Sequence, residues 1–227
     1  MMEESGSLEN TNDELSNTRL AERFDGSLKQ RWIDICESLG DAFTEIQYLN
    51  NLSYVMQLVF NECSLTVEGT EKPMLQLAKY ANEDKNKVRH SLRVVRKPIG
   101  QKQTTRDCVV KDIVARVKTD DCVNDLLTNH NLPGATVANI QIFLNDLVDI
   151  CWLMCIANPP LKLNFEVKGV EYKLVSQRFM EFATTWNNTY SDGNPGAVYL
   201  VAWPAVERED SKGNGGFLKK GEAIVCR

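Results

Sequence analysis

Apolar residues recur at steps of three and four through the first two thirds of the chain, which is the period of an α-helix. The first stripe with this period consists of Leu20, Phe24, Leu28, Trp32, Ile35 and Leu39. Gly26 interrupts the stripe, which predicts two short helices in place of one. Gly40 follows the last apolar position and is placed to cap the second of them.

Two longer helices are expected next. Asp41 suits an N-cap, and the apolar period after it predicts a helix to about Cys63. Pro73 suits the first turn of a further helix that reaches about Val95. Beyond it, two helices are predicted over residues 104–117 and 122–129. A last helix, over residues 137–157, is apolar on nearly all sides, which is typical of a buried central helix.

After Pro160 the apolar period changes from that of a helix to two, the period of a strand. A hairpin is predicted over residues 161–175 with its turn at Lys168 and Gly169, followed by a short helix over 177–186. Strands are predicted at 197–203 and at 217–226, the latter with Gly221 as a bulge. The expected fold class is therefore α+β: about six helices around a central apolar helix, followed by a small antiparallel sheet.

Length and composition fit one domain behind a short tail. The 227 residues are 43% hydrophobic and 25% charged, enough for a sizeable core. Residues 1–15 are acidic and have few apolar anchors, which predicts a disordered tail, with a single domain over 16–227. Seven cysteines, an odd number without dense spacing, favour a reducing compartment such as the cytoplasm.

The central helix carries two carboxylates, Asp146 and Asp149, on otherwise apolar surface. Carboxylates are costly in lipid, so the segment 136–157 is not expected to span a membrane, and any membrane contact should be peripheral. In a protein core each would need an Arg, a Lys or backbone donors. This favours structural ion pairs over acid–base catalysis.

The sequence contains no recognisable enzyme signature. Cys151 and Cys155 share a helix face, but zinc needs two further ligands, and neither His90 nor His130 has a neighbouring Cys or His. A buried core pair is the favoured interpretation, although catalysis by one of these thiols stays an alternative. Phosphate-binding, dinucleotide-binding and hydrolase motifs are absent from the sequence. We therefore expect no enzyme activity, no catalytic residue, no metal and no cofactor.

A basic run is the main candidate for a binding site. Residues 79–118 hold twelve Lys and Arg against four Asp and Glu, within a chain of net charge −5. Such a cluster can bind anionic lipid headgroups or an acidic protein surface. No aromatic residue lies between 81 and 131 to stack on bases, which argues against nucleic acid. The predicted anion-binding residues are Lys85, Lys87, Arg89, Arg93, Arg96, Lys97, Lys102 and Arg106.

Two other interpretations of the basic run stay open. It can be a solvated face that balances the acidic amino-terminal segment, because residues 1–50 hold eleven Asp and Glu against four Lys and Arg. It can also be a protein–protein surface, with an acidic partner or a second copy of the chain docked on it. Trp203 and Pro204, where a strand is predicted to end, are a further candidate for a site. Because Pro has no amide donor, this junction predicts a corner of the fold.

Two stretches resemble the carboxy-terminal domain of the mitochondria-eating protein family. The first has a Leu-Ala-x-x-Phe segment followed by Trp-x-Asp, and the last has an aromatic residue, Trp-Pro-Ala and a Lys-Gly strand. With the apolar helix and the predicted hairpin between them, the resemblance spans about residues 16–227. The matching positions are Leu20, Ala21, Phe24, Trp32, Asp34, Tyr199, Trp203, Pro204, Ala205, Lys220 and Gly221.

The resemblance implies a non-enzymatic protein of the cytoplasm and the mitochondrial outer membrane. It implies a role in mitochondrial quality control and mitophagy, with binding to the anionic lipid cardiolipin. Under this interpretation the basic run contacts the membrane from its surface, and association into a homo-oligomer remains open.

Overall fold

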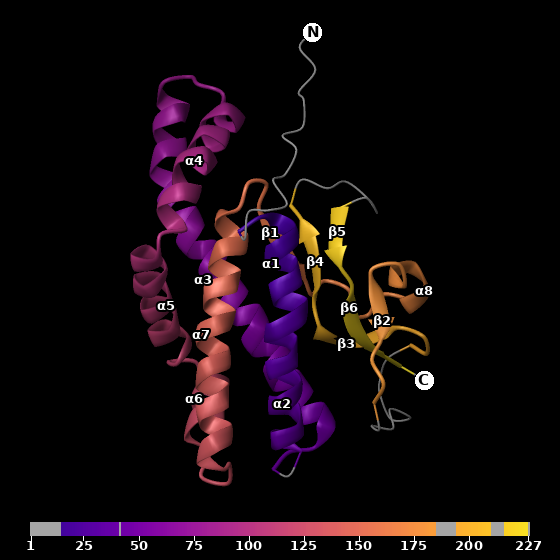
Figure 1. Cartoon of the computed structure of the whole chain (residues 1–227). Helices are drawn as coiled ribbons and strands as arrows, with labels where there is room; N and C mark the ends of the chain where they lie inside the picture. Colours follow the sequence, from indigo (N-terminus) through magenta and orange to yellow (C-terminus); the bar gives the residue numbers. More distant parts are fainter. Residues whose placement is uncertain (1–14, 41, 185–193, 210–215, 227) are drawn as a thin grey trace.

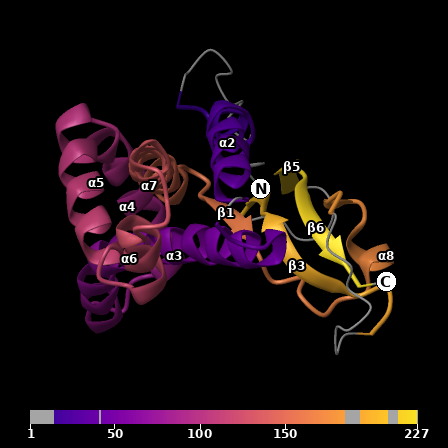
Figure 2. The same ribbon diagram turned by 90° about the horizontal axis from the view of Figure 1, so that it is seen from below.

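The helices and strands form two regions that meet along one long helix. The computed structural model describes residues 15–40, 42–184, 194–209 and 216–226. Figure 1 shows most of the helices on one side and the strands on the other. In Figure 2, α3 (Glu45–Tyr80) extends from the helical side to β3 (Val198–Trp203), where Ser53 Oγ donates to the carbonyl oxygen of Val201 at 2.7 Å. The predicted α+β class is confirmed.

The first helical stretch is continuous. α1 (Asn17–Arg23) passes through a π-helical turn, η1 (Phe24–Leu28), into α2 (Lys29–Leu39). The predicted break at Gly26 is therefore wrong, because the wider π-helical turn accommodates the glycine without ending the helix. Phe24 and Leu28 stay buried, and Gly40 is the C-cap of α2 as predicted.

The predicted start of a helix at Pro73 is also wrong, since α3 runs through this residue. A proline removes one backbone hydrogen bond, and packing at buried Val67 and Ala78 on either side holds the helix together. Thr44 caps α3, and Asp41, the predicted cap, lies outside the described residues. The chain turns at Asn82, whose φ is +57°, and Asp84 then caps α4 (Lys85–Gly100).

The remaining helices follow the sequence pattern closely. α5 (Gln103–Val117) and α6 (Asp121–Thr128) agree with their predicted ranges, and α7 (Gly134–Ile156) is the central helix. By length and composition α7 could cross a membrane, as could no other helix in the described parts of the chain. About two thirds of its most apolar window is buried inside the protein, as expected for a core helix.

The strands form two three-stranded sheets, not the single antiparallel sheet that we predicted. In the first, β4 (Ala205–Arg208) pairs antiparallel with β1 (Leu161–Asn164) and with β5 (Phe217–Lys219). In the second, β6 (Gly221–Val225) lies between β3 and β2 (Phe179–Glu181), and its pairing with β2 is parallel. The chain changes sheets at Pro204 and again at Lys220, so the last predicted strand is two strands.

Two local predictions fail in the same region. The second limb of the expected hairpin is a helical turn, α8 (Tyr172–Val175), and the partner of β1 is the distant β4. The short helix predicted near residue 180 is strand β2. In both cases pairing with a strand far along the chain overrides the local preference, which a short apolar run cannot reveal.

Trp203 forms the corner that we expected. Its side chain is fully buried, with its ring centroid 4.6 Å from that of Phe24 and 5.4 Å from that of Trp32. Aromatic rings at these separations add to the free energy of burial. Pro204 then carries the chain into the other sheet. The junction is therefore a packing site between helices and strands.

Candidate functional site

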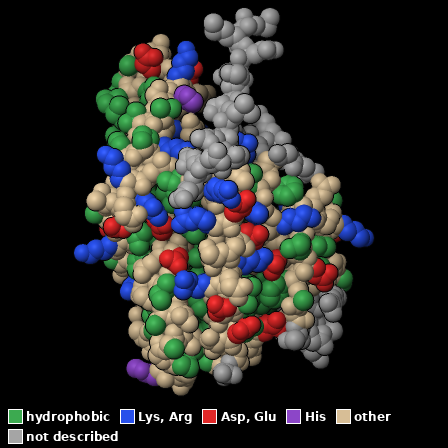
Figure 3. Space-filling view, viewed as in Figure 1, with side chains coloured by type: hydrophobic (Ala, Val, Ile, Leu, Met, Phe, Trp, Pro, Cys, Tyr) green, Lys and Arg blue, Asp and Glu red, His purple; other side chains and the backbone are tan. Residues whose placement is uncertain are grey.

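The hairpin formed by the end of α3 and by α4, residues 70–100, extends beyond the rest of the helical region (Figure 1). We call it the arm. Figure 3 shows hydrophobic side chains gathered on the outer surface of the arm. Large apolar side chains are normally scattered singly on a surface, so a group of them marks a contact site. The exposed ones on the arm are Met74, Leu77, Tyr80, Val94, Val95 and Ile99.

Four of the predicted anion-binding residues are lysines, of which three are exposed and Lys97 is half-buried. They form no ion pair with any residue that the structure describes. Lys87 shares a helix face with exposed Val94, because residues seven apart lie two turns along the same side. Cationic and apolar side chains are therefore mixed on one surface. We call these four the arm lysines: Lys85, Lys87 and Lys97 on α4, and Lys102, which lies just past the arm at the N-cap of α5.

The other four predicted residues are arginines, and each pairs with a carboxylate of the same chain. Glu71 of α3 accepts a hydrogen bond from Arg96 and lies 3.6 Å from Arg89. Arg93 reaches across to Glu209 at 2.7 Å, and Arg106 pairs with Asp149. The eight predicted anion-binding residues are therefore divided into paired arginines and lysines without an ion pair. The spacing of 89, 93 and 96 turns these three arginines toward α3 and the sheet.

A groove of about 560 Å³ lies between the arm and the body. Its lining combines charged and apolar side chains. The buried or half-buried apolar ones, which include Phe60, Val67 and Leu161, are called its floor. Glu71 is the most buried acidic residue of this lining, at 9% exposed. The charged lining consists of Glu68, Glu71, Lys72, Arg89, Arg93, Arg96, Lys162 and Glu209, and the apolar lining includes Phe60, Val67, Leu75, Cys155, Pro160 and Leu161.

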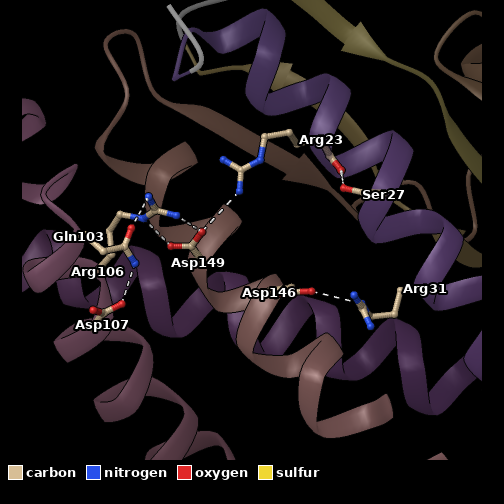
Figure 4. Close-up of polar contacts among 8 residues, drawn as sticks. All are labelled: Arg23, Ser27, Arg31, Gln103, Arg106, Asp107, Asp146 and Asp149. Atoms are coloured by element: carbon tan, nitrogen blue, oxygen red, sulfur yellow. Dashed lines mark hydrogen bonds and ion pairs between the residues drawn. The ribbon is translucent and has the colours of Figure 1, made fainter.

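The carboxylates of α7 hold helices together, as Figure 4 shows. Arg106 Nε donates to Asp149 Oδ1 at 2.7 Å, a second nitrogen of Arg106 bonds Oδ2, and Arg23 lies 3.5 Å away. This hydrogen bonding raises the pKa of Arg106. Asp146 pairs with Arg31 at 3.2 Å. The prediction that these carboxylates make structural ion pairs is confirmed.

The thiols of α7 form a core pair. Cys151 and Cys155 are both buried, and burial raises the pKa of Cys155 to about 12 and that of Cys151 well above its usual value. Both are therefore neutral thiols near pH 7, whereas a nucleophile needs the thiolate. In the described ranges no group of three or more His, Cys, Asp or Glu is placed to hold a metal ion.

Reasoning from the sequence missed the groove and the apolar character of the arm. A signal for the first was present: Glu68 and Glu71 interrupt the apolar stripe of α3 on the side of Val67. A signal for the second was the run of Val94, Val95 and Ile99 within the basic segment. Neither shows which face is covered, because that depends on how α4 folds back on α3.

These features define an α+β domain whose distinctive parts are surfaces and a groove suited to binding. The family model described as Mitochondria-eating protein matches residues 16–224. The chain belongs to the mitochondria-eating protein family, which links it to mitochondria and their quality control. No curated protein and no solved structure matches the chain.

Proposed function

We propose that the chain is a non-enzymatic binding module that attaches from the cytoplasm to an anionic, cardiolipin-like membrane surface through the arm. The observation that carries the proposal is the mixture of free lysines and exposed apolar side chains on this hairpin. Lys85 and Lys87 lie near its tip, and Tyr80, 74% exposed, lies at the end of α3 beside them.

The energies require both kinds of side chain. A lysine near an anionic membrane contributes about 1 kcal/mol, so the four lysines together contribute about 4 kcal/mol. That free energy corresponds to a dissociation constant of about 1 mM, which is weak. Fully burying one Val, Leu or Ile side chain adds about 1.5–3 kcal/mol. Partial insertion of Leu77, Val95 and Ile99 would therefore bring the affinity into the micromolar range.

Vesicle sedimentation tests the proposal. The native chain should sediment with vesicles containing cardiolipin and remain in solution with neutral ones. Its binding should weaken when salt is raised from low to physiological concentration, because salt screens exposed charges. A variant with glutamine at the four arm lysines should lose most of this binding. The substitutions are Lys85→Gln, Lys87→Gln, Lys97→Gln and Lys102→Gln.

The matched control removes lysine charge elsewhere. Lys111 and Lys118 are exposed on α5, outside the arm, so Lys111→Gln with Lys118→Gln should bind vesicles as the native chain does. Equal sedimentation with neutral and anionic vesicles would refute the proposal. If the chain instead forms salt-sensitive dimers in light scattering and ignores vesicles, the arm is a surface for self-association.

A further inference from the structure

The groove between the arm and the body combines an apolar floor with a surplus of positive charge. Its lining carries five cationic and three acidic side chains, and one of the cations, Lys162, lies 3.5 Å from Glu207, which is outside the lining. Glu71 is shared between Arg89 and Arg96, so one carboxylate serves two guanidinium groups. Lys72, at the exposed edge, forms no ion pair within the described residues. The charge in the groove therefore favours an anion.

The arginines of the groove are also incompletely bonded. The Nε atoms of Arg93 and Arg96 are buried and have no hydrogen-bond acceptor among the described residues. A buried donor without a partner is costly, and a guanidinium group has five N–H donors. Bonding to Glu209 and Glu71 uses only part of this capacity. A small shift of either side chain would bring its remaining donors to an anionic group.

The floor of the groove is suited to an apolar part of a ligand, whereas the arginines are suited to an anionic group. Phe60, Val67 and Leu161 give it apolar surface, and its volume of about 560 Å³ lies within the range of small-molecule pockets, roughly 300–1,000 Å³. An inorganic anion would leave this surface in contact with water, and a purely apolar molecule would leave the arginines unused. Only a ligand with an anionic head and an apolar chain matches both the arginines and the apolar floor.

We propose that the groove is a binding site for a single-chain amphiphile with an anionic head, which enters as a single molecule from solution. The head lies against Arg93 and Arg96, and the chain lies over Val67 and Leu161. This inference goes beyond membrane attachment, because it uses the inner face of α4 and no bilayer. It also assigns the arginines a role separate from that of the arm lysines.

Isothermal titration calorimetry with decyl phosphate, kept below its micelle concentration, tests the inference on the native chain. Decyl phosphate should bind to one site, and it should bind at least tenfold more tightly than decanol or inorganic phosphate. Decanol lacks the charge, and inorganic phosphate lacks the chain. No measurable binding of decyl phosphate, or an affinity equalled by either control, would overturn the inference.

Two variants locate the site. Arg93→Gln removes one charge, and its partner Glu209 is 54% exposed, so the fold should tolerate the change; affinity should fall at least tenfold. Leu75→Trp fills the groove from a half-buried position and should abolish binding. Lys97→Gln, on the same helix but outside the groove lining, should bind normally. Native affinity in both groove variants would place the ligand elsewhere and contradict the inference.

The two proposals fail independently. Arg93→Gln should still sediment with anionic vesicles, whereas the variant lacking the four arm lysines should still bind decyl phosphate. Bound decyl phosphate should also slow alkylation of Cys155, which lines the groove, when the modified peptide is followed by mass spectrometry. If Cys155 is alkylated at the same rate with and without saturating ligand, the groove is not the site.

Discussion

The pair formed by Asp149 and Arg106 allows a quantitative test of how the central helix is held. Replacing Asp149 with Asn keeps the size of the side chain and removes its charge. Arg106 loses a two-point ionic contact, and Arg23 loses a second, longer one at 3.5 Å. Both Asp149 and Arg106 are only 17% exposed, so water cannot fully replace the lost partner.

The expected loss lies between two limits. Breaking a buried ion pair costs about 3–5 kcal/mol, whereas an exposed pair contributes about 0–1 kcal/mol. Because the pair is largely buried and Asn can still accept one hydrogen bond, Asp149→Asn should lower the free energy of unfolding by about 2–3 kcal/mol. For a chain of this length that corresponds to a fall of about 5–10 °C in melting temperature.

Urea and thermal unfolding followed by circular dichroism measure the effect, and Asp146→Asn is the matched control. Asp146 lies on the same helix, but its pair with Arg31 is 47% and 37% exposed. Its replacement should cost under about 1 kcal/mol. The double variant Asp149→Leu with Arg106→Met should recover part of the stability lost by Asp149→Asn, because the largely buried charge of Arg106 is removed together with its partner and only the more exposed Arg23 loses a contact. Equal losses for Asp149→Asn and Asp146→Asn would refute this reasoning.

Three further predictions concern the corner of the sheets and the core thiols. A Cβ at Gly221 would lie 2.6 Å from backbone atoms of β3 and β4, so Gly221→Ala should lower the free energy of unfolding by more than about 2 kcal/mol in a urea titration. Gly26→Ala is the control: its Cβ would have nothing within 4 Å, so the change should be neutral or stabilising by about 0.5–1 kcal/mol. Exposed Cys108 should react with iodoacetamide at pH 7.5 far faster than buried Cys155. Rapid labelling of Cys155 would contradict its assignment as a core thiol and favour a catalytic one. Burial raises the pKa of Cys155 from about 9 in the unfolded chain to about 12 in the folded one. The contribution of this thiol to the free energy of unfolding should therefore be fully present below pH 9 and be lost as the pH rises toward 12. Cys155→Ala should reduce that loss.

The two proposals give the basic segment two functions that are carried by different side chains. The arginines of α4 pair with Glu71 and Glu209 and line the groove. The lysines of α4 form no ion pair within the described residues, and Lys87 lies on the side of exposed Val94. Arginine suits the inner role because its planar group can bond several acceptors at once, and lysine suits the outer role as a solvated point charge. A substitution of a groove arginine should therefore leave the function of the arm lysines intact, and a substitution of an arm lysine should leave that of the arginines intact.

Several features of this protein are determined by the sequence alone, because they depend on neighbours in the chain. The apolar period defines α5, α6 and α7, since one helix face repeats every three or four residues. The α+β class follows from the change of period after Pro160. That Asp146 and Asp149 need a cation or backbone donors as partners follows from the cost of an unpaired carboxylate on an apolar helix.

The tertiary structure decided the rest, because those features depend on residues far apart in the chain. Packing on both sides carries α3 through Pro73, and distant partners turn the region near residue 180 into a strand. The same holds for the candidate site. A count of charges finds the basic run, but only the fold places Glu71, Glu209 and Asp149 opposite its arginines and leaves its lysines free. Whether a charged side chain is neutralised depends on the residue that packs opposite it in the fold, and the spacing of residues along the chain does not determine that residue.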